Sequence, residues 1–226
     1  MGGIAWHRQA YQYSGGGGAG GSTLLTGLVS YWKMDEVSNG SVPVPRADSF
    51  GANTLTDNNT VASAVGIISN AALFTLGNTE SLSLASLSLT APYSVSFWVS
   101  PNAIIATNQG CFESSTLFMF LQGTTGKMVL QNTGSFATVA AVGTGAFHHI
   151  VCVLNGASSA IYLDNVKATG TVSGNSSGAT RIGSTSGGGG EFLDGKIDEF
   201  GLWSRALSDA DVLALYNGGA GLTYPF

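Results

Sequence analysis

The sequence predicts an all-β protein, a sandwich or barrel of short strands with one short helix near the C-terminus. Three observations predict this class. Short runs rich in β-branched and aromatic residues recur along the chain, and several of them alternate apolar and polar side chains. Glycine supplies 33 of the 226 residues and separates these runs without the period of three that marks collagen. Helical periodicity is clearest in one segment close to the end.

The composition excludes two classes of function. Only 9% of the residues are charged, and 13 acidic residues against 8 basic ones give a formal net charge of -5. Because no cluster of lysine and arginine is present to neutralise phosphates, nucleic-acid binding is excluded. With 44% hydrophobic residues the chain can bury a large core, yet no apolar run reaches the roughly 18 to 20 residues that span a bilayer. We therefore expect one soluble β domain without membrane insertion.

The first 26 residues divide into two parts that precede the expected domain of residues 27–226. Residues 4–13 form an extended arm rich in aromatic side chains, and residues 14–22 form a linker of Gly, Ala and Ser. Aromatic and arginine side chains are favoured in interfaces, so we expect the arm to dock on a neighbouring protein; the alternative is a disordered tail. The residues expected to make this contact are Trp6, His7, Arg8, Tyr11 and Tyr13. No basic segment followed by an apolar stretch occurs here, so we expect synthesis in the cytoplasm or trimming to a mature form.

Strands are expected from residue 27 onward, where apolar and β-branched runs alternate with turn residues. The clearest of them are residues 28–34, 93–99, 116–121, 127–131, 148–154 and 160–163. Asn155 and Gly156 lie between two apolar runs and predict a hairpin, because both residues tolerate the positive φ that hairpin turns need. Many short strands at this spacing are typical of a sandwich or a barrel.

One helix is expected after Ser208, which can cap its first turn. Asp209 and Asp211 follow, where the helix dipole favours anions. An apolar stripe at the helical spacing i, i+3, i+4 then consists of Val212, Leu215 and Tyr216, and Gly218 and Gly219 end the segment. We expect this stripe to cover one apolar edge of the sandwich.

Four segments occur in an order that carries a family resemblance. They are GLVSYWKMDE at residues 27–36, YSVSFWVSP at 93–101, FHHIV at 147–151 followed by IYLD at 161–164, and GKIDEFGLWSRALS at 195–208. In this order they resemble the laminin G-like, concanavalin A-like family, over nearly all of residues 27–220. The resemblance implies a jelly-roll sandwich of two curved antiparallel sheets. The family mostly binds glycans, often with calcium, and sometimes hydrolyses them, so the fold alone does not fix the function.

The resemblance also implies a calcium site at a rim of the sandwich, in an acid-rich loop after the strand near Leu73. In this chain the loop is residues 75–80, and Glu80 is its only acid. Calcium takes six to eight oxygen ligands, including carbonyl groups. The candidate ligands for a possible calcium ion are Asn78, Glu80 and Asp198.

Asp198 and Arg205 belong to the segment that matches the family best. The structural interpretation is that an ion pair or backbone hydrogen bonds lock the last strand to the start of the helix, since the arginine fork satisfies several acceptors at once. The functional alternative is that Asp198 joins the calcium ion.

The carboxylates do not have the spacing of a glycoside hydrolase, which needs two carboxyl groups that flank the scissile bond. Catalytic relatives with this fold resemble one another in a Glu-x-Asp-x-(x)-Glu run on a single strand, and this chain has no such run. Its densest acidic segment, with Glu191, Asp194, Asp198 and Glu199, is spaced differently, and Glu113 stands alone. We therefore expect no enzymatic activity and assign no catalytic residue.

The histidines and cysteines also predict structural roles. His148 and His149 are adjacent, so on a strand they point to opposite faces and cannot hold one metal ion together. We expect one of them to be packed and the other to lie at the surface. Cys111 and Cys152 have no metal or redox spacing; they are two packed free thiols or, alternatively, one bridge.

A glycan site cannot be located from the sequence. Trp32, Trp98 and Trp203 lie inside apolar strand patterns and are expected in the core rather than against sugars. The polar loop residues that serve either as glycan contacts or as ordinary turn residues are Asp48, Asn53, Asp57 and Asn58.

We expect a non-enzymatic laminin G-like module displayed on a larger assembly, most of all a phage virion. In this hypothesis the arm anchors the protein to capsid or tail proteins, and the sandwich, present in many copies or as a homo-oligomer, faces outward to stabilise the particle or adhere to host glycans. Its location is then the virion surface. The alternatives are a free glycan-binding lectin, which would be extracellular, and a glycoside hydrolase.

Overall fold

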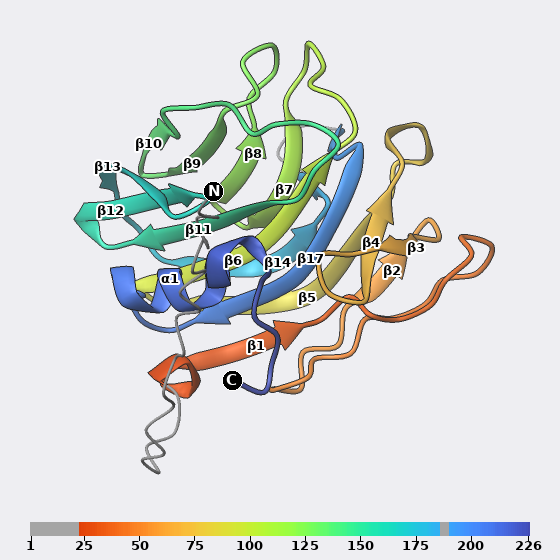
Figure 1. Ribbon diagram of the computed structural model, residues 1–226, viewed down its shortest axis with the longest axis horizontal. Coiled ribbons are helices and arrows are strands. Elements are labelled where there is room, and N and C mark those ends of the chain that lie inside the picture. Colours follow the sequence, from red (N-terminus) through yellow and green to blue (C-terminus); the bar gives the residue numbers. More distant parts are fainter. Residues whose placement is uncertain (1–22, 186–189) are drawn as a thin grey trace, which may run out of the picture.

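Two antiparallel β-sheets pack face to face in the computed structural model, which describes residues 23–185 and 190–226 (Figure 1). This arrangement confirms the predicted all-β sandwich. The first sheet has the strand order β13-β12-β11-β6-β17-β4-β3, and β1 pairs with β17 beside β4. Its strands are β1 (Leu28–Trp32), β3 (Ala62–Val65), β4 (Asn70–Phe74), β6 (Tyr93–Pro101), β11 (His148–Leu154), β12 (Gly156–Leu163), β13 (Val166–Val172) and β17 (Gly195–Trp203).

The second sheet has the order β10-β9-β8-β7-β14-β5-β2, and a two-stranded ribbon of β15 and β16 follows β14. Its strands are β2 (Thr56–Asn58), β5 (Ser81–Leu89), β7 (Gln109–Ser114), β8 (Leu117–Leu121), β9 (Met128–Asn132), β10 (Gly134–Ala137) and β14 (Ser176–Ile182). The ribbon consists of β15 (Ser184–Thr185) and β16 (Glu191–Phe192). Consecutive strands fall in different sheets at several points, as in β5 and β6, so the sequence order does not reveal the spatial order.

The core lies between the sheets and follows from the period of two along each strand. In β6, Val95, Phe97 and Val99 are fully buried and belong to the core, where Phe97 stacks on Phe200 of β17 with ring centroids 5.3 Å apart. The alternate residues of β6 are buried too, because the outer face of this sheet is also covered. The strand therefore carries small polar residues, Ser94, Ser96 and Ser100, on a face that is nevertheless buried.

A second apolar layer covers the outer face of the first sheet. Helix α1 (Asp209–Tyr216) lies across this face in Figure 1, and its Val212 and Leu215 pack with Val151 of β11. The C-terminal residues add aromatic contacts: the rings of Tyr31 and Phe226 meet edge to face, with their centroids 5.3 Å apart. The helix therefore covers this face, as its stripe predicts.

Helix α1 begins after Ser208, as predicted, but it ends at Asn217 rather than at the predicted Gly218 and Gly219. Ser208 caps it and forms a capping box with Asp211. The helix ends because Asn217 adopts a left-handed conformation, with φ of 47° and ψ of 46°, before the two glycines are reached. Three short 3₁₀ turns complete the helical content of the described residues: η1 (Thr23–Leu25), η2 (Leu76–Asn78) and η3 (Asn217–Gly219).

Two hairpins follow one another at β11, β12 and β13. The predicted hairpin at Asn155 and Gly156 joins β11 to β12, but the last paired residues are Val153 and Ala160, so the turn is longer than two residues. The compact turn is the next one, where Asp164 and Asn165 have φ of 49° and 66°. Both residues tolerate this left-handed conformation, which matches a two-residue hairpin.

Several further predictions are settled by burial. Trp32, Trp98 and Trp203 are at most 2% exposed, as expected for core residues. Cys111 and Cys152 are buried free thiols, and burial raises the pKa of the Cys111 thiol to about 12. No helix of the described residues is long and apolar enough to cross a membrane.

Candidate functional site

A polar groove of about 350 Å³ opens beside the second sheet, where β2, β5 and β14 meet the ribbon of β15 and β16. We call it the polar groove. Its lining residues are mostly amides and hydroxyls, with one arginine and one phenylalanine: Asn58, Asn59, Thr79, Ser81, Ser83, Arg181, Ser184, Thr185, Gly190 and Phe192. This mixture of many small polar groups and one aromatic ring fits a hydroxyl-rich ligand better than an apolar one.

Two asparagines organise the β2–β5 side of the groove. The side-chain amide of Asn58 donates to the Ser83 hydroxyl at 2.9 Å and to the Ser81 carbonyl at 3.2 Å. Asn59, in a left-handed conformation at the turn, donates to the carbonyl and the hydroxyl of Thr79, each at 3.0 Å. These bonds hold the turn after β2 against the start of β5, so the polar wall is fixed before any ligand binds.

The opposite wall is the ribbon, and two glycines allow its position. At Gly183, φ is 83° and a Cβ atom would lie 2.2 Å from the ring of Phe74, so only glycine permits the turn out of β14. At Gly110 of β7, a Cβ atom would lie 2.2 Å from the backbone nitrogen of Thr185. The ribbon therefore packs directly on the β7 backbone and places Phe192 at the groove.

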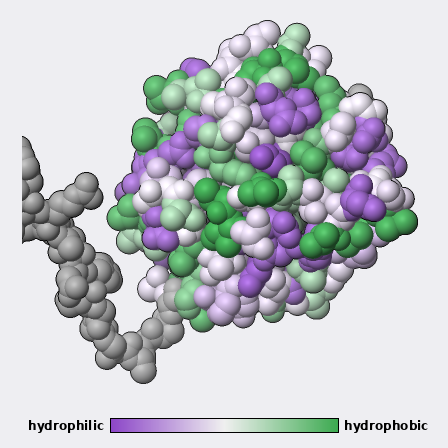
Figure 2. Space-filling view, turned by 45° about the vertical axis from the view of Figure 1, so that its right-hand side comes forward, coloured by the Kyte–Doolittle hydropathy of each residue, from purple (hydrophilic) through white to green (hydrophobic). Residues whose placement is uncertain are grey.

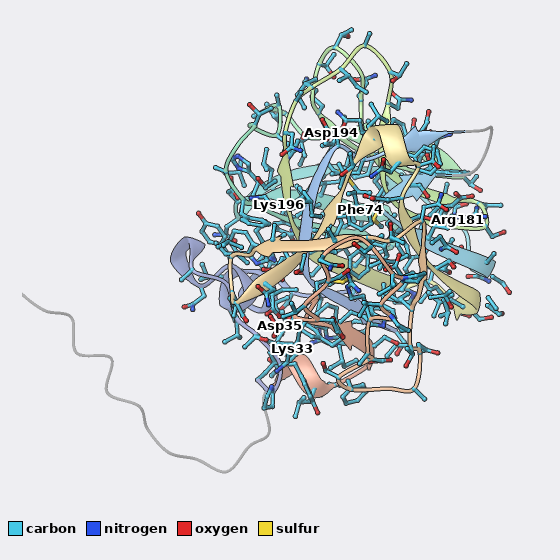
Figure 3. All side chains as sticks on the ribbon, turned by 90° about the vertical axis from the view of Figure 1, so that its right-hand side faces the viewer. Lys33, Asp35, Phe74, Arg181, Asp194 and Lys196 are labelled. Carbon is cyan, nitrogen blue, oxygen red and sulfur yellow. The ribbon has the colours of Figure 1, made fainter. Side chains whose placement is uncertain are left out.

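The charged groups of this region are arranged in two sets. Arg181 of β14 lies directly opposite Glu113 of β7 in the strand register. Figure 3 places Arg181 on the side of the molecule opposite α1. The Glu191 carboxylate accepts hydrogen bonds from the Asn108 amide at 2.9 Å and the Thr185 hydroxyl at 2.6 Å. Arg181 is thus the one charged residue among the described residues that line the groove, and the carboxylates of Glu113 and Glu191 belong to its neighbours.

The visible surface in Figure 2 mixes hydrophilic, weakly hydropathic and apolar residues. In Figure 2, hydrophilic and weakly hydropathic residues surround separate small apolar patches. Some exposed large apolar side chains, such as Val37 and Val65, are single residues, whereas Val139 and Val166 line one pocket together with Ala140 and Ala141. Isolated apolar residues of this kind are normal on a protein surface.

Residues 76–213, well over half of the chain, match the family model described as the concanavalin A-like lectin/glucanases superfamily, in its laminin G-like branch. The chain therefore belongs to this family, as its segments predict. A comparison with curated protein sequences gives no match.

Solved structures share the fold at low sequence identity. Domain 4 of AbnA, a GH43 extracellular arabinanase from Geobacillus stearothermophilus, in complex with arabinotriose, is 21% identical with a TM-score of 0.65, over 86% of this chain and 98% of that one. The binding domain of Paraclostridial Mosquitocidal Protein 1 is 15% identical with a TM-score of 0.65, over 85% of this chain and 52% of that one. Trypanosoma rangeli sialidase in complex with sialic acid is 13% identical with a TM-score of 0.63, over 86% of this chain but only 34% of the enzyme.

The loop residues considered for glycan contact take different roles. Asp48 closes its own loop, because its carboxylate accepts backbone N–H groups of Tyr31, Gly51 and Asn53. The Asn53 side chain donates to the Ser30 hydroxyl at 2.7 Å. Asp57 is 5% exposed and accepts the N–H groups of Val44 and Val61. Of these four loop residues, Asn58 alone lines the polar groove.

The three candidate calcium ligands do not come together at one point: Asn78 and Glu80 contact each other, but Asp198 lies apart from them. Glu80 accepts the Asn78 amide at 2.9 Å and the Thr75 N–H at 2.6 Å, which closes the loop after β4. Asp198 lies at the other end of β4, where it accepts the N–H groups of Ile67 and Ile68. Both carboxylates thus face N–H donors rather than a space for a cation. No group of three potential metal ligands occurs among the described residues. Calcium binding stays a prediction.

Asp198 and Arg205 both lock the last strand, but with separate partners. Burial raises the pKa of Asp198 to about 8, while its carboxylate accepts three backbone N–H groups, including that of Glu199 at 2.9 Å. Arg205 donates to the Thr26 carbonyl at 2.7 Å, to the Thr23 carbonyl at 2.8 Å and to Asp211 at 2.8 Å. The backbone hydrogen bonds predicted for this segment are therefore present, and the ion pair of Arg205 is with Asp211.

The two adjacent histidines separate as predicted. His149 is 1% exposed, and its Nε2 lies 2.9 Å from the Ser96 hydroxyl, beneath the ring of Trp98. Burial lowers the pKa of His149 to about 3, so it is neutral at ordinary pH. His148 is half-buried, with Nδ1 2.6 Å from Asp164.

Two residues of the polar groove, Arg181 and Phe192, were not identified from the sequence. Arg181 lies in a strand without a strong apolar pattern, and Phe192 follows a run of glycines that indicates only a turn. Arg181 and Phe192 lie at the same groove because the chain turns at Gly183 and forms the ribbon of β15 and β16. Gly183 is the local sequence feature that indicates this turn. The predicted arm residues, Trp6 to Tyr13, lie outside the described residues.

Proposed function

We propose that this chain is a non-enzymatic carbohydrate-binding domain and that glycans bind in the polar groove. The observation that carries the proposal is the composition of the groove, where fixed amides and hydroxyls surround one aromatic ring, Phe192. Amides and hydroxyls offer the donors and acceptors that sugar hydroxyls require. An aromatic ring offers a flat apolar surface of the kind that sugar faces stack on.

Membership of a superfamily of lectins and glucanases supports a carbohydrate ligand. The arabinanase domain with the same fold was solved with arabinotriose, and the mosquitocidal protein domain is named a binding domain. The sialidase of the comparison does not decide between binding and catalysis, because the chain spans only about a third of that enzyme.

The partners of the acidic residues support a non-enzymatic role. Both oxygens of Glu191 accept hydrogen bonds within the ribbon region. Asp194 accepts the Asn102 amide at 3.0 Å, and Asp198 is fully buried under backbone N–H groups. These carboxylates stabilise the fold, and the pair that a glycosidase needs on both sides of a glycosidic bond is not evident among them.

A glycan array probed with the intact protein tests the proposal. We expect binding that is lost or strongly reduced in Phe192→Ala, and unchanged in Phe50→Ala, a matched control in which another exposed ring is removed. A reducing-sugar assay on the bound polysaccharide should detect no hydrolysis. Binding that survives Phe192→Ala, or reducing ends that disappear in Glu113→Gln or Glu191→Gln, would contradict the proposal.

We propose in addition that the domain is displayed in many copies on a larger assembly, with a phage virion as the first expectation. Low charge, high Gly, Ser and Thr content and the aromatic arm on its glycine linker support this role. Multiple copies raise effective concentration, so a weak single site gains about 10² to 10⁴ in avidity. Particles that carry the protein should therefore retain glycans that the monomer releases.

A further inference from the structure

Seven residues form one row across the entire second sheet, one from each strand. The register pairs them consecutively, from β2 to β10: Thr56, Ser83, Arg181, Glu113, Phe118, Gln131 and Ser135. At about 4.8 Å per strand, this row extends over roughly 29 Å.

The row lies on the outer face of the sheet. The next residue along most strands of the row belongs to the sandwich core, as Leu82, Ile182, Met119 and Leu130 show. Because side chains alternate between the two faces of a strand, the row itself points away from the core. Helix α1, which covers the first sheet, is on the other side of the molecule (Figure 1).

The polar groove is one end of this row. Ser83 and Arg181 belong to both, so the row leads from the groove, whose lining ends at Arg181 on this side, across the sheet toward β7 and β8. A half-buried aromatic ring, Phe118, lies two strands beyond Arg181. Past it, the exposed Gln131 offers an amide, as Asn58 does inside the groove.

We propose that the ligand is a linear, uncharged oligosaccharide that lies across the strands along this row, with Phe192 and Phe118 as two separate stacking platforms. The proposal rests on the proposed function and names its ligand class. A ligand that bound through its terminal sugar alone would contact the groove and would not contact the residues of the row beyond Arg181.

The order of chemical groups along the row indicates an uncharged chain. Arg181 and Glu113 are direct cross-strand neighbours, and opposite charges at this separation attract one another, so they present little net charge to a ligand. Glu113 is only 6% exposed, so a ligand would not touch it directly, but its carboxylate at the centre of the row repels an acidic polysaccharide. The remaining members are hydroxyls, an amide and a phenyl ring, which suit sugar hydroxyls and sugar faces. The absence of a wide apolar area on this row disfavours a protein partner.

Chain-length dependence tests the proposal on the full-length protein. Linear arabino-, xylo- and cello-oligosaccharides, from disaccharides to hexasaccharides, serve as probes in calorimetric titrations, with sialyllactose as a charged terminal-sugar probe. We expect affinity for at least one linear series to increase with chain length. Phe118→Ala should weaken the hexasaccharide by roughly threefold to tenfold and leave the disaccharide unchanged.

Two further variants keep the test decisive. Phe50→Ala is the matched control, since it removes an exposed ring outside the row, and it should bind like the wild type. Gln131→Ala, at an exposed position, repeats the test if Phe118→Ala does not fold. Affinity that is independent of length and unaffected by both row variants, but lost in Phe192→Ala, would overturn the extended site and leave the proposed function intact. Preference for sialyllactose would also overturn it, and failure of every probe would overturn both.

Discussion

Replacing Arg205 with alanine should destabilise the domain by about 1 to 3 kcal/mol. The guanidinium joins three parts of the chain: the carbonyls of Thr23 and Thr26 before β1, and Asp211 in the first turn of α1. A net hydrogen bond contributes about 1 kcal/mol, and one to a charged group more. The Arg205 side chain is about a quarter exposed, and solvent screens its charge in part. The total stabilisation is therefore well below that of a fully buried guanidinium with the same hydrogen bonds.

Asp211 limits the loss because it keeps other partners. Its carboxylate also accepts the N–H and the hydroxyl of Ser208 and the hydroxyl of Thr23. The carboxylate is therefore not left unpartnered in Arg205→Ala, which excludes the penalty of an isolated buried charge. These partners hold the pKa of Asp211 below its usual value. Stability from its ionised form is present above the unfolded pKa, about 3.9, and is lost as the pH falls below it.

Urea and thermal unfolding at pH 7 measure the effect. For a chain of this length, 2 kcal/mol corresponds to a decrease in Tm of roughly 4 to 8 °C. Arg181→Ala is the matched control, because it removes the same side chain from the groove, where Glu113 is its charged cross-strand neighbour, and we expect a smaller loss of at most about 1 kcal/mol. The difference should shrink as the pH falls below about 3.9, because the unfolded chain then binds a proton at Asp211 while the folded chain, with its lowered pKa, does not. If Arg205→Ala and Arg181→Ala unfold alike at pH 7, the hydrogen bonds of Arg205 do not stabilise the fold.

Three further outcomes follow from the structure. Burial raises the pKa of Glu199 to about 7, so this carboxyl ionises at lower pH in the unfolded chain than in the folded protein. The free energy of unfolding should therefore fall as the pH rises from about 4.3 to 7. Urea titrations of Glu199→Gln should show a weaker dependence on pH, and a wild-type free energy that does not change with pH would contradict this. Gly183→Ala should lower stability by about 2 kcal/mol or more, because of its positive φ and the Phe74 ring, whereas Gly77→Ala, with open space around it, should be nearly neutral in the same assay. Removal of residues 1–22 should leave the Tm unchanged but abolish incorporation into the assembly, and normal occupancy of the truncated protein would refute the role of the arm.

The point of truncation matters because residues 23–26 pack on the domain. The indole N–H of Trp203 donates to the Leu24 carbonyl at 2.7 Å, and Arg205 holds Thr23 and Thr26. The sequence places these residues with the linker, since they carry no strand pattern. Their carbonyls have no sequence signature, so only the structure could show that they belong to the folded part.

Local patterns predicted the strands well because each strand carries its own evidence. β6 alternates serine with apolar side chains over much of its length, β11 ends in the apolar run IVCVL, and α1 has its cap and its stripe within ten residues. Contacts between distant residues were not predictable in the same way. Arg46 is fully buried and donates to the Val61 carbonyl at 2.9 Å, although a lone arginine in a loop indicates a solvated side chain.

The candidate site shows the same limit more sharply. Asn58 could be identified as a polar loop residue, but its partner Ser83 is 25 positions away. The row from Ser83 to Gln131 combines strands whose order in the sheet, β5-β14-β7-β8-β9, differs from their order in the chain. One changed pairing would place different residues beside Arg181. A site of this kind depends on register, and register across several strands is a property of the whole fold.

The two outer faces of the sandwich explain where a ligand can bind. A sandwich buries its inner faces by construction, and each outer face needs its own cover or remains open. Here α1 and the C-terminal aromatic residues Tyr224 and Phe226 cover the outer face of the first sheet, where Tyr31 also donates to Glu199 at 2.6 Å. A ligand there would have to displace packed apolar side chains. The second sheet instead presents hydroxyls, an amide and paired charges beside the ribbon, so binding variants are best sought on that sheet, beginning with Phe192 and Phe118.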